Sequence, residues 1–138
     1  MTAKNRILAT LVGFVVLFLL GWLFYGILLM DFYADNTGSA TNLMRAEDEM
    51  IWWALILGNL LQAYFLVYIF SKWEDINTFG AGFKGGAILG LILGLGFNLT
   101  MYATSNMMNL IGTLVDPIVY MVMMGITGGV IGMMLGRK

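Results

Sequence analysis

The sequence predicts an all-α membrane protein with four transmembrane helices and both termini in the cytoplasm. Apolar residues make up 60% of the chain and charged residues only 11%, a composition outside the range of soluble globular domains. Four apolar runs are each long enough to cross a bilayer core, which takes about 20 residues. Because four such spans leave only short connections in 138 residues, we expect one transmembrane domain covering residues 1–138.

The first span is predicted from Ile7 to Met30 and the second from about Met50 to Phe70. The first follows Lys4 and Arg6 and so resembles a signal peptide at its start. Its apolar part exceeds the roughly 7 to 15 residues of a signal-peptide core, so we expect the helix to be retained. Aromatic residues at both ends of the second span form the belt that is typical of a membrane-water boundary.

The third span is predicted from Phe83 to Thr104 and the fourth from Pro117 to Gly136. Asp116 followed by Pro117 has the pattern of a helix start, with aspartate as the cap and proline in the first turn. The twenty residues that follow would form a helix about 30 Å long, which matches one bilayer core.

The distribution of basic residues predicts the orientation of the four spans. The amino terminus, the connection between spans two and three, and the carboxyl terminus contain all but one of the seven basic residues; the exception, Arg45, lies in the first connection. Cytoplasmic segments of membrane proteins are enriched in lysine and arginine. We therefore place both termini in the cytoplasm and the protein in the inner, cytoplasmic membrane.

Glycines recur every fourth residue in the third and fourth spans, and we predict that they are packing surfaces. They are Gly82, Gly86, Gly90 and Gly94, followed by Gly128, Gly132 and Gly136. In lipid, helices associate through close backbone approach at such small residues. In the predicted orientation both sets lie in the cytoplasmic half. A four-residue spacing also drifts around a straight helix, by about 120° over the first set, which predicts a second neighbour for the third span. Gly38, in the first connection, is expected to tolerate a larger side chain.

Polar residues occupy the opposite half of the predicted bundle. The candidate cluster consists of Asn59, Gln62, Asn98, Thr100, Asp116 and Tyr120. An amide without a partner is costly at membrane depth, so these side chains must face protein, water or a ligand. Two interpretations stay open: the set lines a cavity that opens outward, or it forms hydrogen bonds between helices and closes the bundle.

The chain contains no cysteine and no histidine, which excludes thiol chemistry, most transition-metal sites and the usual general base. The acidic run from Glu47 to Glu49 lacks the spacing of an EF-hand loop. Most of the twelve methionines lie in the last 38 residues, where we expect them to fill gaps beside glycine rather than bind copper(I). We therefore predict no enzyme activity, no metal and no cofactor.

One further motif carries a family resemblance. The first span ends in Gly21-Trp22-Leu23-Phe24-Tyr25-Gly26, a polar connection follows, and the third span is rich in glycine. This layout resembles an uncharacterised bacterial family of small four-span inner-membrane proteins, classed as a domain of unknown function. The resemblance implies a fold and a location but no activity. Small multidrug exporters are a poorer match, because their first helix contains a carboxylate and residues 1–30 here contain none.

The sequence thus favours a small integral membrane protein that acts through helix packing, as a homo-oligomer or as an accessory subunit of a larger membrane assembly. The alternative is a small transporter or channel-like protein with an outward-facing polar site. The expected partners are the lipid bilayer and a second copy or a larger membrane protein, and no nucleic acid is expected.

Overall fold

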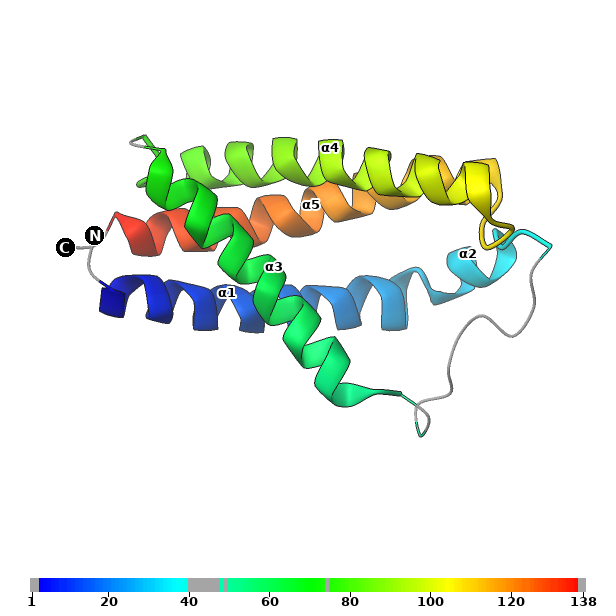
Figure 1. Cartoon of the computed structure of the whole chain (residues 1–138), viewed down its shortest axis with the longest axis horizontal. Coiled ribbons are helices and arrows are strands. Elements are labelled where there is room, and N and C mark those ends of the chain that lie inside the picture. Colours follow the sequence, from blue (N-terminus) through cyan, green and yellow to red (C-terminus); the bar gives the residue numbers. More distant parts are fainter. Residues whose placement is uncertain (1–2, 40–47, 49, 74, 137–138) are drawn as a thin grey trace.

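The computed structural model describes residues 3–39, 48, 50–73 and 75–136. Its elements are α1 (Ala3–Leu23), the π-helical turn η1 (Phe24–Leu28), α2 (Met30–Asp35), α3 (Trp52–Lys72), α4 (Phe79–Thr104) and α5 (Leu110–Leu135) (Figure 1). Four helical segments are long and apolar enough to cross a membrane: Lys4–Leu28, Trp52–Lys72, Phe79–Thr104 and Leu110–Leu135. The predicted all-α, four-span fold is confirmed. Glu47 and Glu49 lie outside the described residues.

The four long helices form a bundle in which α4 and α5 run side by side and α3 crosses the others diagonally (Figure 1). The start of α1, the end of α5 and the connection between α3 and α4 lie at one end of the bundle, which we call the terminal end. Lys4, Arg6, Lys72 and Lys84 all belong to segments near this end. The cytoplasmic placement of this end stays a prediction that rests on the basic residues.

The apolar core lies between α1, α3 and α5. It contains Leu17 from α1, Leu66 and Phe70 from α3, and Met124 and Ile131 from α5. The buried residues of α3 are all found from Ala63 onward, so only the half of α3 nearer the terminal end packs into the core. The other half diverges from α4 and α5 (Figure 1).

The glycines at every fourth position of α4, from Gly82 to Gly94, face α5. An added Cβ at Gly82 or Gly86 would collide with a backbone oxygen of α5, and one at Gly94 would lie 3.0 Å from the Cα of Pro117. Gly128 and Gly132 provide the matching surface on α5. All four glycines of the α4 series therefore meet the same neighbour, so the helix drift gives no reason to expect a second one. A neighbouring helix that crosses α4 at an angle can stay in contact with glycines whose direction rotates gradually around the axis of α4.

Helix α5 begins at Leu110, so the prediction that Asp116 caps a helix starting at Pro117 is wrong. Asn109 is the cap, because its side chain accepts a hydrogen bond from the backbone nitrogen of Gly112 at 2.8 Å. Pro117 lies inside the helix, as is tolerated in transmembrane helices where neighbours satisfy the freed backbone groups. Asp116 therefore lies inside α5 instead of at its start.

Candidate functional site

Asp116 is the centre of a hydrogen-bond network that joins four segments of the chain. Its Oδ1 accepts hydrogen bonds from the hydroxyls of Tyr33 at 2.5 Å and Tyr25 at 3.1 Å. Its Oδ2 accepts one from the Nδ2 of Asn98 at 2.9 Å. The donors come from η1, α2 and α4, and the carboxylate comes from α5. Charge-assisted hydrogen bonds of this kind are stronger than bonds between neutral groups.

The π-helical turn brings both tyrosines to the carboxylate. In η1 the backbone nitrogen of Leu29 donates to the oxygen of Phe24 at 2.8 Å, five residues earlier. Such a turn holds one more residue than an α-helical turn and is frequent at functional sites. The chain then continues into α2, and the rings of Tyr25 and Tyr33 lie 5.2 Å apart.

Another hydrogen bond between helices lies one helical turn further along α5, at Tyr120. The hydroxyl of Tyr120 donates to the Oε1 of Gln62 at 2.8 Å. This bond connects α3 to α5 at the point where α3 begins to diverge. Residues four apart share one face of a helix, so Tyr120 and Asp116 face the same side of α5. Of the six predicted cluster residues, Gln62, Asn98, Asp116 and Tyr120 are thus joined to other helices.

Two of the predicted cluster residues lie outside this network. Asn59 donates to the backbone oxygen of Leu55 on its own helix at 2.8 Å, because α3 has by then moved away from α4 and α5. Thr100 is exposed and donates to the oxygen of Gly96 on its own helix. It lies two residues from Asn98, a rotation of about 200°, and therefore faces the opposite way.

The family model described as "Protein of unknown function (DUF1761)" matches residues 8–132. The chain belongs to this family. The resemblance predicted from the first span, the polar connection and the glycine-rich third span is therefore confirmed. No curated protein and no solved structure matches the chain.

In this family member the network is closed at the end of the bundle opposite the termini by a contact between α2 and the start of α5. The backbone nitrogen of Asn109 donates to the oxygen of Asn36 at 3.0 Å, and the Nδ2 of Asn109 donates to the Oδ1 of Asn36 at 3.1 Å. Gly38 lies against this contact, since an added Cβ would collide with the backbone oxygen of Asn106. The expectation that Gly38 tolerates a larger side chain is therefore wrong.

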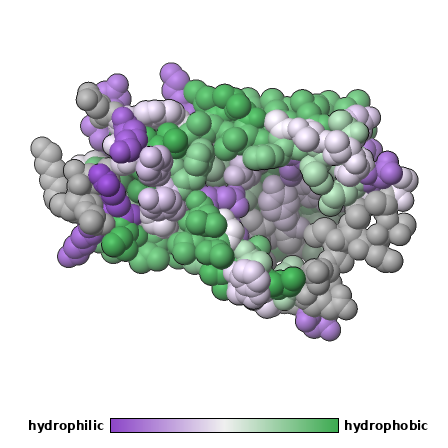
Figure 2. Space-filling view, in the orientation of Figure 1, coloured by the Kyte–Doolittle hydropathy of each residue, from purple (hydrophilic) through white to green (hydrophobic). Residues whose placement is uncertain are grey.

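The network supplies Asp116 with hydrogen-bond donors but with no basic partner. Among the described residues, no lysine or arginine pairs with Asp116. Asp116 is partly exposed, and the face shown in Figure 2 is hollowed beside α3, with polar residues inside the hollow and hydrophobic ones along its upper and left edges. Burial, and secondarily the hydrogen bond to Asp116, raises the pKa of Tyr33 far above its ordinary value, so this hydroxyl stays a donor.

Sequence reasoning missed Tyr25 and Tyr33. Tyr25 belongs to the motif that ends the first span, and nothing in that motif predicts a bond to Asp116. Tyr33 lies in the polar connection, where nothing in the sequence predicts that the chain returns to the bundle. The available signal was chemical: a carboxylate within a span needs donors, and tyrosines beside the end of the first span can supply them.

Proposed function

We propose that the protein is a non-enzymatic binding protein of the cytoplasmic membrane that takes a small organic cation at Asp116, as a small transporter with an outward-facing site would. The observation that carries the proposal is a carboxylate within a candidate transmembrane helix that is held by three donors and paired with no cation among the described residues. Carboxylates within spans occur at substrate and ion pathways. A positively charged ligand would supply the missing partner.

The tyrosine rings favour an ammonium group over a simple metal ion. The adjacent rings of Tyr25 and Tyr33 lie 5.2 Å apart and both hydroxyls reach Asp116, so a ligand beside the carboxylate would also meet aromatic surface. Ammonium cations are attracted to aromatic faces, and quaternary ammonium groups are recognised in this way. The close contact between α4 and α5 toward the terminal end favours a site that is reached from the outer side.

The test is calorimetric titration of the purified chain in mild detergent with tetramethylammonium. We expect saturable binding to the original chain and at least a tenfold weaker affinity in Asp116→Asn, which keeps the size of the side chain and removes its charge. Asp35→Asn is the matched control, because this aspartate is exposed and lies in α2 near the same end. Equal affinities in the two variants, or no saturable binding to the original chain, would refute the proposal.

An oligomeric or accessory role is a second candidate. The observation that favours it is Gly58, at the diverging end of α3, where an added Cβ would meet no atom within 4 Å. A glycine on an open helix face allows another helix to approach closely. The corresponding test measures the mass of the protein in native lipid and in mild detergent, which shows whether more than one chain is present.

A further inference from the structure

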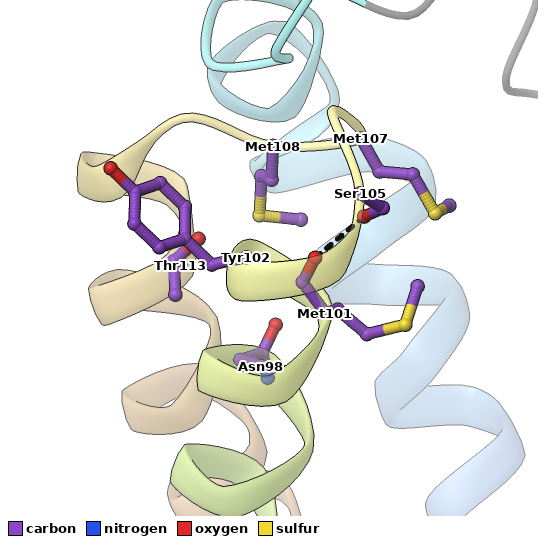
Figure 3. Close-up of a pocket in the computed structure, with 7 residues that line it drawn as sticks. All are labelled: Asn98, Met101, Tyr102, Ser105, Met107, Met108 and Thr113. Carbon is purple, nitrogen blue, oxygen red and sulfur yellow. Dashed lines mark hydrogen bonds between the residues drawn. The ribbon is translucent and has the colours of Figure 1, made fainter.

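A pocket of about 130 Å³ lies next to the Asp116 network, with which it shares Asn98, where α4 ends and α5 begins. Its lining includes Asn98, Met101, Ser105, Met107, Met108 and Thr113 (Figure 3). This volume is several times that needed by one water molecule. The pocket is at the end of the bundle opposite the termini, so in the predicted orientation it faces outward.

The pocket methionines differ from those of the core. Met123 and Met124 are 4% and 0% exposed and fill the space between helices as the sequence predicts. Met101 and Met107 are 44% and 42% exposed, and neither belongs to the core. Met108 is held against α5, because an added Cβ at Gly112 would lie 2.8 Å from its sulfur. Three thioethers therefore border one pocket, and two of them, those of Met101 and Met107, have no packing role in the core.

The oxygens of Ser105, Thr113 and Asn98 act only as acceptors toward a ligand, and the hydroxyl of Tyr102, which also lines the pocket, offers a lone pair as well. The hydroxyls of Ser105 and Thr113 already donate to the backbone oxygens of Met101 and Asn109, at 2.6 and 2.8 Å. The Nδ2 of Asn98 donates to Gly94 and Asp116, and Figure 3 shows its Oδ1 directed toward the methionines. A site with sulfur and oxygen lone pairs and no basic side chain in its lining suits a cation.

We infer that this pocket binds a soft monovalent metal ion, Cu(I) or Ag(I), through the thioethers of Met101, Met107 and Met108. Thioether sulfur selects soft metals, whereas carbonyl and hydroxyl oxygen alone would favour hard ones. The chain has no cysteine or histidine to compete for such an ion. The inference revises the expectation that the methionines only fill gaps, and it is independent of organic-cation binding at Asp116.

The experiment titrates the purified full chain with Cu(I), kept reduced by ascorbate, against a chromogenic Cu(I) chelator, and with Ag(I) by calorimetry. We expect one ion per chain, and an affinity that falls at least tenfold in the variant Met107→Leu/Met108→Leu and further when Met101→Leu is added. Leucine conserves volume and apolar character, so the fold should persist, which circular dichroism checks.

The matched control carries Met30→Leu, Met50→Leu and Met133→Leu. These methionines are 55%, 39% and 44% exposed and lie outside the pocket, so the control should bind like the original chain. X-ray absorption of the Cu(I)-loaded chain should show sulfur neighbours. The inference would be overturned by equal losses of affinity in the pocket and control variants, or by an affinity that follows the total number of exposed methionines. An absorption spectrum with only oxygen neighbours around copper, or no binding to the original chain, would overturn it as well.

Discussion

Two tyrosine hydroxyls share one oxygen of Asp116, and Tyr33 makes the shorter of the two bonds. An ionised carboxylate accepts about four hydrogen bonds, and here it receives three from side chains of other segments. Because Tyr33 belongs to the short helix α2, its bond ties a segment with few core contacts to the central helix α5. The network therefore holds α2 in place as well as supplying donors to Asp116.

We predict that Tyr33→Phe lowers the free energy of unfolding by about 1.5 kcal/mol, the usual contribution of a hydrogen bond to a charged group. Unfolding in mild detergent, followed by circular dichroism, measures the change. Tyr102→Phe is the control, because Tyr102 is exposed and its hydroxyl makes no hydrogen bond with the described residues. A Tyr33→Phe variant as stable as the control would show that the bond contributes nothing to stability.

The same variant has a pH signature. The pKa of Tyr33 is raised by burial and by the hydrogen bond to Asp116, so above about pH 10 the hydroxyl ionises in the unfolded chain but stays protonated in the folded one. The unfolded chain then binds fewer protons, and stability falls as pH rises. Between pH 9 and pH 11 the original chain should lose more stability than Tyr33→Phe does, and Tyr102→Phe should follow the original chain.

The polar residues show what could be predicted at this scale. Asp116 and Asn98 could be assigned to one cluster from the sequence, because a polar side chain within or beside a span must find a partner. Tyr33 could not, since its position depends on the π-helical turn, which has no sequence pattern. Asn59 was placed in the cluster by depth alone, and depth does not reveal the direction in which α3 diverges.

At the scale of elements, the contact between α4 and α5 rests on backbone approach. The buried residues of α4 are all glycines, from Gly82 to Gly94, so this helix contributes almost no side chain to the core. The spacing of the glycines predicted a packing surface, and the structure places that surface against α5. The start of α5 was predicted seven residues late, because proline inside a transmembrane helix has the same local sequence as proline at a helix start.

We predict that Gly86→Ala destabilises the protein by about 2 kcal/mol or more, because the added methyl group would collide with the backbone oxygen of Met124 and overpack the contact. Gly96→Ala is the control. It lies on the same helix with no atom within 4 Å of an added Cβ, and alanine has the better helix propensity. Thermal unfolding of both variants in one detergent gives the comparison. Similar melting temperatures would contradict a tight α4–α5 contact.

At the scale of the whole molecule, the bundle has a closely packed terminal end and an opposite end where α3 stands apart (Figure 1). Both the Asp116 network and the methionine pocket lie toward that opposite end. The fold class and the number of spans followed from hydropathy, because only helices of this length satisfy their backbone groups in lipid. The divergence of α3 could not be predicted from the sequence. In lipid, a helix face that packs against protein and one that meets lipid can both be apolar, so hydropathy does not distinguish them.

The orientation can be tested directly because the chain contains no cysteine. We predict that a membrane-impermeant maleimide labels Asn106→Cys in intact cells, while Asp75→Cys is labelled only after the cells are permeabilised. Both positions are exposed in the structure and lie in opposite connections. Labelling of Asp75→Cys in intact cells would reverse the orientation and place the polar network toward the cytoplasm.

The last prediction concerns self-association. The glycines of α4 are used within the chain, so a second copy would need another surface, and the diverging end of α3 provides one around Gly58. We predict that the mass measured in native lipid exceeds that of one chain and that Gly58→Leu reduces it to 15.3 kDa, the mass of a single chain. Because no atom of the chain lies within 4 Å of an added Cβ at Gly58, the variant should stay folded, and Gly96→Leu serves as the control on another open face. A single-chain mass for the original protein in both lipid and mild detergent would rule out the homo-oligomer, and an unchanged oligomer in Gly58→Leu would move the contact to another helix.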